Sequence, residues 1–197
     1  MFRPRQSVIE NQFCSYAAQT DDATGVGGVI CYAGSVLYLD EDATNEEAIV
    51  KKMVYNDTPF TPFGFAMQKV KSGYHSVHPP GFYMPGDLGS SDVIAQPSYS
   101  GGSINGTKEA PLGVAHLGIW DTVHYTAKGT GTGANDITPS AAIKPGEALY
   151  AANDEAKVTN NATPAADAAD LSTGENVSTT IVARVIKGVS LLRLQLI

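Results

Sequence analysis

The sequence predicts an all-β protein, either a β-barrel or a β-sandwich. Short apolar runs with period-2 alternation recur along its 197 residues, and 20 glycines and 11 prolines separate them. Charged residues make up only 17% of the chain, below the roughly 25% usual for soluble domains. With 43% apolar residues, the chain is long enough for one domain with a real core, or for two small β-units.

The N-terminal third alternates irregular and strand-like segments. Residues 1–24 carry no clear period, which predicts an extended arm that lies on another surface. Residues 29–32 and 36–39 are short β-prone runs, and residues 63–70 alternate large apolar with small or polar side chains, so each run predicts a strand. Residues 45–54 are compatible with a helix or a strand; their β-prone neighbours favour the extended form.

A long segment rich in Pro, Gly and Ser follows at residues 74–106. A central strand cannot hold so many prolines, so we expect a long loop with short edge strands. Loops of this length in compact domains are often functional. We treat it as an excursion from a single β domain that spans residues 25–197.

Strand signals return in the C-terminal half. The terminal run is the clearest, because Leu192, Leu194 and Leu196 alternate with polar residues, as in a strand held inside a sheet. A surface loop is expected at 160–174. The predicted strands of this half are 112–117, 119–125, 148–151, 157–159, 178–186 and 189–197.

One segment of the N-terminal half resembles one of the C-terminal half. Gly34–Asp42 reads GSVLYLDED, and Gly146–Glu155 reads GEALYAANDE. Each is followed by a polar stretch and an aliphatic strand signal. The similarity has two explanations, a duplication or two strands that independently need the same turn–strand pattern.

Charge and targeting features exclude several classes. A net charge of −7 without a large basic cluster argues against nucleic-acid binding, because that affinity comes mainly from Lys and Arg. No stretch approaches the roughly 20 apolar residues of a membrane helix, and the first residues lack the apolar core of a signal peptide. We therefore expect synthesis in the cytoplasm. Cys14 and Cys31 are then expected to be free thiols rather than a disulfide.

The residues that could carry chemistry form no convincing set. His75 and His78 have a metal-like spacing but no third ligand nearby in sequence. His116 and His124 share one strand parity and Asp121 the other, so no local His–Asp pair is expected. The acidic residues between 40 and 47 lack the ligand spacing of a calcium loop. The sequence thus predicts a protein that is not an enzyme, with no metal site and no cofactor.

Four segments together carry a resemblance to a known family: Gly34–Asp40, Phe63–Met67, Gly146–Tyr150 and Ile181–Leu196. In this order they resemble the capsid cement (head decoration) proteins of tailed bacteriophages. The resemblance covers about half of the chain. It implies a β-barrel or β-sandwich that assembles as a homotrimer on the capsid exterior of a virion made in the host cytoplasm. There it would bridge copies of the major capsid protein and stabilise the shell.

The irregular segments supply the expected contact residues. An arm suits docking across a neighbouring subunit, so Phe2, Arg3, Arg5 and Phe13 are the candidate capsid-docking residues. The alternative function is a carbohydrate- or receptor-binding β module on a virion or surface layer. Aromatic residues of the excursion would then form a stacking platform. They are Tyr74, Phe82, Tyr83 and Tyr99.

Overall fold

The computed structural model describes residues 2–5, 10–17, 29–40, 48–56, 58–72, 92–95, 109–126, 143–153, 155–162, 176–187 and 192–196. These residues form strands, turns and irregular segments, and none of them lies in a helix. The predicted all-β fold class is therefore confirmed. The strands are β1 Phe2–Pro4, β2 Glu10–Ala17, β3 Val29–Cys31, β4 Val36–Leu39, β5 Ile49–Lys52, β6 Pro62–Ala66, β7 Lys69–Ser72, β8 Asp92–Ala95, β9 Glu109–Thr122, β10 Tyr125–Thr126, β11 Ala148–Ala151, β12 Val158–Thr159, β13 Ala183–Lys187 and β14 Leu192–Leu196.

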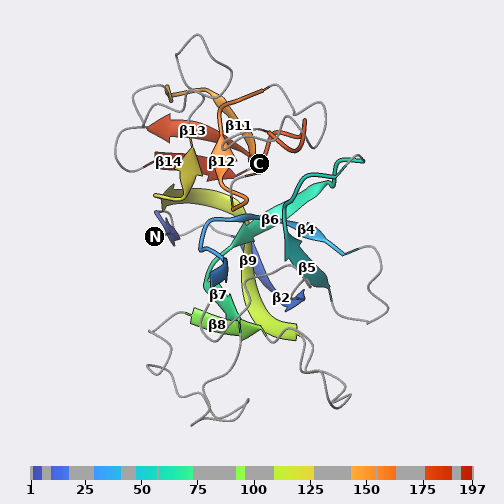
Figure 1. Ribbon diagram of the computed structural model, residues 1–197. Helices are drawn as coiled ribbons and strands as arrows, with labels where there is room; N and C mark the ends of the chain where they lie inside the picture. The colour runs from blue at the N-terminus through green and yellow to red at the C-terminus, as the bar shows by residue number, and fades with distance from the viewer. Residues whose placement is uncertain are drawn as a thin grey trace, which may run out of the picture.

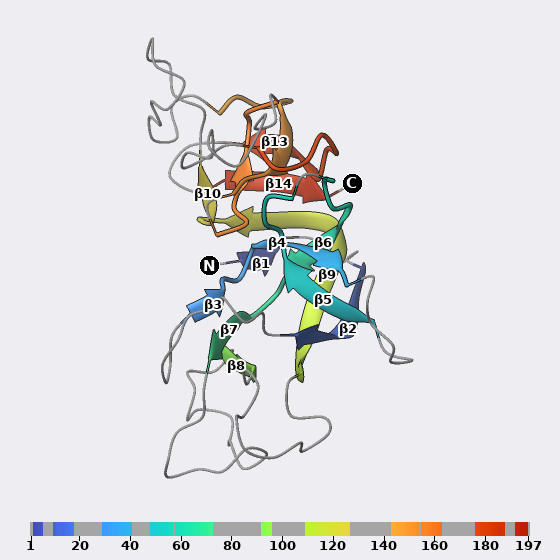
Figure 2. The same cartoon turned by 45° about the vertical axis from the view of Figure 1, so that its right-hand side comes forward.

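The 14-residue strand β9 joins two lobes of the molecule. Its first half pairs with β2 and β6, and its second half pairs with β14 and β1. Figure 1 shows β9 rising from the lower lobe and bending into the upper one, where β11 to β14 lie. In Figure 2 the N-terminal strand β1 lies beside this bend, at the junction of the lobes.

Strands of the lower lobe pair in a closed circuit, which we call barrel 1. The circuit runs from β9 to β2, β5, β4 and β6 and returns from β6 to β9. Closure leaves no free sheet edge within the paired segments, and this is how barrels avoid unpaired backbone groups. A small sheet of order β3-β7-β8 lies beside it.

Side-chain alternation divides barrel 1 into an inner and an outer face. Leu37, Ala66 and Val114 point into one buried cluster with residues of β2 and β5, which forms the barrel interior. Their neighbours Phe65 and Ala115 belong to a second cluster, shared with the upper lobe. Because successive side chains of a strand point to opposite faces, the same strands supply both the barrel interior and the surface that packs on the other lobe.

The upper lobe, which we call barrel 2, has the same circular order. The second half of β9 pairs with β14, which is followed by β13, β11, β12 and β10. After a bend at Val123, the chain runs from β9 directly into β10, so β9 and β10 count as one bent strand position that begins and ends this order. Each barrel therefore contains five strand positions, and β9 contributes to both.

The same turn precedes β4 in barrel 1 and β11 in barrel 2. Its third residue is a glycine with positive φ, Gly34 at 98° and Gly146 at 88°. Ser35 N–H donates to the Tyr32 carbonyl at 3.0 Å, and Glu147 N–H donates to the Lys144 carbonyl at 3.2 Å. The same hydrogen bond thus closes both turns. A turn with positive φ at this position strongly favours glycine.

Strand registers repeat between the two barrels as well. Gly34 N–H donates to the Ala66 carbonyl, and Gly146 N–H donates to the Val185 carbonyl, both at 2.8 Å. β2 runs parallel to β5 in barrel 1, and β10 runs parallel to β12 in barrel 2. The matched pairs are Val36–Phe65 with Ala148–Arg184, Leu37–Gly64 with Leu149–Ala183, Tyr38–Lys51 with Tyr150–Thr159, and Leu39–Val50 with Ala151–Val158. The two barrels therefore repeat one arrangement of turn and strands, and the two similar turn–strand sequences occupy equivalent positions in it.

Several predicted strands agree with the observed ones, and two predictions were wrong. Residues 63–70 do not form one strand, because a bend at Met67 separates β6 from β7. Residues 112–117 and 119–125 are not two strands, because β9 continues through Gly118, which adopts a φ of 119°. The described part of 45–54 is extended, as favoured.

The described parts of the predicted N-terminal arm and of the excursion form strands. Within residues 1–24, β1 and β2 are extended and both lie on β9 of the same chain. Within residues 74–106, β8 is described, and it pairs with β7 in parallel. The expected loop at 160–174 lies almost entirely outside the described residues.

Candidate functional site

The two barrels meet along a contact that we call the interbarrel seam, formed by the Gly34 turn (residues 32–35) and the barrel 2 segments 122–124 and 155–156. The seam is tight. A Cβ added at Gly34 would lie 2.8 Å from the Thr122 Oγ1 and 3.3 Å from both the His124 Cβ and a ring carbon of Phe2. Glycine is thus needed here for its positive φ and for the close approach of barrel 2.

Backbone and side-chain hydrogen bonds cross the seam at Ser35. Its fully buried hydroxyl lies 3.0 Å from the His124 Nε2 and donates to the Glu155 carbonyl at 2.9 Å. The same hydroxyl accepts the Tyr32 N–H at 3.2 Å. Next to it, Val36 N–H donates to the Ala156 carbonyl at 2.8 Å. Both carbonyls belong to residues with positive φ, 51° and 53°.

The Ser35–His124 pair resembles a nucleophile and base by distance alone. His124 is 7% exposed, and its Nε2 also lies 3.1 Å from the Glu155 carbonyl, which can only accept. The Tyr32 ring stacks on the imidazole at 5.2 Å. In this arrangement the buried Ser35 hydroxyl donates its hydrogen to the Glu155 carbonyl. The Ser35–His124 pair therefore links barrel 1 to barrel 2.

A buried carboxylate ties both chain ends to β9. Asp121, with a fully buried side chain, contacts the Arg5 Nε at 2.6 Å and the Arg193 Nε at 2.9 Å. Arg193 lies in β14 and Arg5 directly follows β1, so one carboxylate joins the N-terminal and C-terminal strands. The hydrogen bond between Arg193 and the Asp121 carboxylate raises the pKa of Arg193 above the usual value for arginine.

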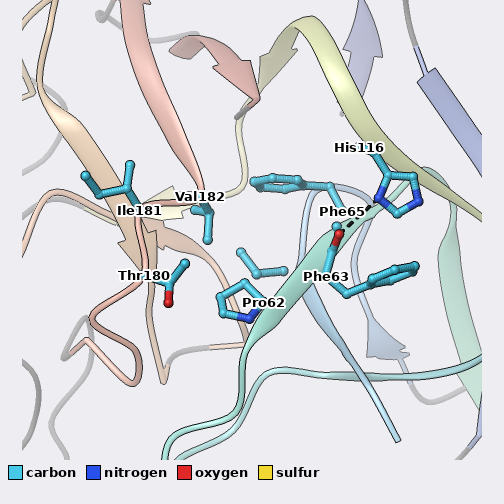
Figure 3. Close-up of a pocket in the computed structure, with 9 residues that line it drawn as sticks. Pro62, Phe63, Phe65, His116, Thr180, Ile181 and Val182 are labelled. Atoms are coloured by element: carbon cyan, nitrogen blue, oxygen red, sulfur yellow. Dashed lines mark hydrogen bonds between the residues drawn. The ribbon is translucent and has the colours of Figure 1, made fainter.

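A small cavity lies between the barrels, lined on one side by β6 and on the other by residues 180–182. Figure 3 shows His116 at its edge, with Nδ1 directed at the Phe63 carbonyl, 3.0 Å away. Because a carbonyl only accepts, Nδ1 carries the hydrogen. The His116 Nε2 is buried without a hydrogen-bond partner among the described residues. The cavity volume of about 70 Å³ is far below the roughly 300 Å³ at which small-molecule sites begin.

The four predicted docking residues lie at different places. Phe2 is 9% exposed and stacks on Trp120 at 4.5 Å and on Phe65 at 5.8 Å. Arg5 keeps 40% of its side chain exposed while it pairs with Asp121. Arg3 lies in β1 opposite Asp121, and Phe13 lies in β2 opposite Gly113. Docking by these four residues stays a prediction.

The remaining sequence candidates are only partly described. Tyr74, Phe82, Tyr83 and Tyr99 lie outside the described residues, as do His75 and His78. Within the part of the chain that the structure describes, no three His, Cys, Asp or Glu side chains gather as metal ligands would. The described residues also include no helix with the length and apolarity needed to cross a membrane.

Both cysteines are buried free thiols, as expected. Cys14 lies in the interior cluster of barrel 1. Burial raises the pKa of the Cys14 thiol, and a hydrogen bond from the Gln12 side chain partly opposes this.

Sequence reasoning missed the seam and the carboxylate between two arginines. Ser35 and His124 are 89 positions apart, so no local motif could relate them. The two histidines expected on one strand face have separate partners, since His116 bonds to Phe63 and His124 to Ser35. One signal existed: Asp121 is a charged residue directly after the apolar pair Ile119 and Trp120, and charges in such positions are usually paired when buried.

The described residues thus define an all-β fold with two barrel-like lobes that share β9. Comparison of the chain with family models, curated proteins and solved structures gives no significant match.

Proposed function

We propose that this chain is a structural cement protein that binds the outer surface of a tailed-phage capsid and bridges its major capsid subunits. The observation that carries the proposal is the structural repeat. Two of the segments fall on β4 and β11 with their turns, a third falls on β6, and the fourth covers β13, the counterpart of β6, together with β14. The resemblance therefore follows the repeating framework of this protein.

A rigid pair of barrels suits such a role. Bridging two capsid subunits requires two contact surfaces held at a fixed distance, and the seam together with Phe2 holds the barrels in one arrangement. Linking two weak contacts makes the second one intramolecular, which raises the overall affinity without new chemistry. A homotrimer would multiply the effect on a symmetric lattice.

The structure refines which residues of the arm to test. For Phe2 to dock on a capsid, its ring would have to leave the stack with Trp120 and Phe65. We therefore expect substitution of Phe2 to lower stability before it affects binding. Arg5, which is partly exposed, can contact a partner without leaving Asp121.

Co-sedimentation with phage heads tests the proposal. The purified chain is mixed with mature tailed-phage heads stripped of their own cement protein and with unexpanded heads as the comparison. We expect the chain to sediment with mature heads and to raise the temperature at which they release DNA. A chain that stays in the supernatant with every head tested contradicts the proposal.

A glycan array separates the alternative from the proposal. Specific sugar binding that is lost in Tyr83→Ala but kept in Tyr150→Phe would favour a carbohydrate-binding module. Tyr150 is the matched control because it lies in β11 of barrel 2 and outside residues 74–106 of the sequence.

A further inference from the structure

The buried carboxylate of Asp121 lies beneath the outer face of a sheet. Strands β1, β9, β14 and β13 are neighbours in this order, and Figure 2 shows them one above another. Arg193 of β14 is the register partner of Asp121. Arg193 and Arg5 both contact the carboxylate, while 34% and 40% of their side chains stay exposed. Two arginines that reach solvent therefore cover the outer side of Asp121.

Strand β13 adds two cations to the same face. Arg184 is the register partner of Gln195, which lies two residues from Arg193, and Lys187 is the register partner of Arg193 itself. Directly paired residues share a face of a sheet, and so do residues two apart along one strand. Arg184 and Lys187 are both exposed. Within the described part of the chain neither of them forms an ion pair.

These cations make one basic surface on an acidic protein. We call it the arginine face, and it consists of Arg5, Arg184, Lys187 and Arg193 around Asp121. Residues 2–5, 118–122, 183–187 and 192–196 contain no acidic residue besides Asp121. The chain has 13 basic and 20 acidic residues, so setting these four cations and Asp121 apart leaves 9 and 19. The cations are far apart in the sequence, and the pairing of β1, β9, β14 and β13 brings them together.

Asp121 holds two of the arginines in position for a further anion. A guanidinium carries five N–H donors in a planar fork and no acceptor. Arg5 contacts Asp121 through Nε, and Arg193 contacts it through Nε and Nη2. The donors left on each exposed guanidinium can bind a second carboxylate without releasing the first. Side chains already held in place lose less conformational freedom when a partner binds.

Lys187 and Arg193 place two cations directly opposite each other. Like charges in this arrangement destabilise a pair of strands. The folded chain by itself therefore gains no electrostatic stability from Lys187 at this position. An anion bound between the two side chains would replace one repulsion by two attractions, so the arrangement favours an anionic partner.

An exposed apolar side chain lies beside these cations. Ile186 directly precedes Lys187 in β13 and is 39% exposed. Arginine is enriched at protein–protein interfaces, where it surrounds apolar contacts. A phosphate backbone would use only the charges of such a surface, whereas an acidic protein segment uses the charges and the apolar side chain. The composition of the arginine face thus fits a protein partner.

We propose that the arginine face binds an acidic segment of a partner protein, with carboxylates at the guanidiniums and an apolar side chain against Ile186. Asp121 between Arg5 and Arg193 is an example of this contact within the chain. The excess of acidic residues elsewhere repels long polyanions, so a short segment that stays on the arginine face is favoured. The inference goes beyond the cement function, because the acidic partner need not be a capsid protein.

Fluorescence anisotropy with the full chain and a short labelled peptide of alternating Glu and Leu tests the proposal. We expect binding that weakens as salt rises and falls about tenfold or more in Arg184→Glu, the effect of losing a charge-assisted hydrogen bond. The control is Thr58→Glu/Thr61→Glu, which makes the same change in net charge at exposed positions before β6 and should keep the wild-type affinity. No binding by the wild type, or equal losses in the two variants, overturns the proposal.

Lys187→Glu separates a binding role from a structural one. It replaces the like-charge pair with Arg193 by an opposite-charge pair. We therefore expect its unfolding temperature to rise while its affinity for the peptide falls about tenfold or more. A Lys187→Glu chain that binds the peptide as tightly as the wild type contradicts the proposal.

A thymidine oligonucleotide of the same charge tests the other class of anionic partner. Tighter binding of the oligonucleotide than of the peptide, lost in Arg184→Glu, would indicate a nucleic-acid site and overturn the proposal. Co-sedimentation with phage heads keeps the two proposals apart. Peptide binding without head binding supports the arginine face and contradicts the cement function, and head binding without peptide binding does the reverse.

Discussion

Asp121 shows how one side chain connects distant parts of the sequence. It is fully buried, and each of its oxygens contacts an arginine whose own side chain is partly exposed. The arginines can therefore stay hydrated while the carboxylate is removed from water. Hydrogen bonds to charged groups contribute more than neutral ones, about 1.5–3 kcal/mol each.

Asp121→Asn is expected to lower the free energy of unfolding by about 2 kcal/mol, because the amide keeps the shape but loses the charge between Arg5 and Arg193. Urea denaturation measures this change. The control is Asp40→Asn, which breaks the more exposed pair with Lys51 and is expected to cost less than about 1 kcal/mol. Equal losses in the two variants would contradict the role given to Asp121.

The Cys14 thiol gives a prediction about alkaline pH. Its pKa is raised in the folded protein, chiefly by burial. At neutral pH the thiol is protonated in both states and has no effect on pH dependence. As the pH rises past the ordinary thiol pKa, the unfolded chain loses this proton first, so the free energy of unfolding falls until the folded thiol also ionises.

We therefore expect Cys14→Ala to lose less stability than the wild type between neutral and strongly alkaline pH, as measured by urea denaturation at each pH. Native Cys14 is also expected to react with thiol reagents only on unfolding. Rapid labelling of the folded protein at neutral pH would show that Cys14 is accessible.

At the scale of the elements, the closure of barrel 1 depends on how closely β6 approaches β9. A Cβ at Gly64 would lie 2.5 Å from the Val114 Cγ1 and 2.9 Å from the Ala115 carbonyl oxygen. The second neighbour is backbone of the paired strand, so it cannot move without separating the strands. At Gly113, by contrast, the nearest atoms belong to the flexible ends of Met67 and Gln68.

Gly64→Ala is expected to destabilise the protein by about 1–3 kcal/mol, the usual cost of overpacking. Gly113→Ala is expected to cost clearly less, because a side chain can yield. Thermal unfolding of the two variants compares them. Adding Val114→Ala to Gly64→Ala should recover only part of the loss, because the Ala115 carbonyl remains; full recovery would mean that the backbone contact is unimportant.

At the scale of the whole molecule, Phe2 belongs to both barrels. Its ring stacks on Trp120 of the strand that enters barrel 2 and on Phe65 of barrel 1. Together with the hydrogen bonds of Ser35, it makes the two barrels one packed body. The N-terminal residues thus stabilise the seam from one side while the Gly34 turn stabilises it from within.

Phe2→Ala is expected to cost about 3–5 kcal/mol, as for other large buried aromatic residues, and to loosen the coupling between barrels. The chain has a single tryptophan, Trp120, beside Phe2. In the wild type, Trp120 fluorescence and far-UV circular dichroism should report one coincident transition, and in Phe2→Ala two that no longer coincide. Phe2→Leu keeps apolar volume and should retain more of the coupling between the barrels. Coincident transitions in Phe2→Ala would contradict the coupling role given to Phe2.

The sequence by itself determined the all-β class, most strand positions and the similarity of the two turn–strand segments. These are local properties: side-chain period, turn glycines and β-branched residues act over a few positions. It also predicted that Cys14 and Cys31 are free thiols, which the structure confirms. The prediction of a strand end at Gly118 was wrong because glycine interrupts the apolar pattern without interrupting the backbone pairing of β9.

Only the tertiary structure decided that the similar segments belong to two barrels with matching registers. Register depends on which distant strands pair, and the 14 residues of β9 serve both barrels at once. The seam is likewise non-local, since Ser35, His124 and Glu155 meet only after both barrels close. A single sequence carries no direct signal for contacts that depend on closure, because their energy exists only once the whole circuit has formed.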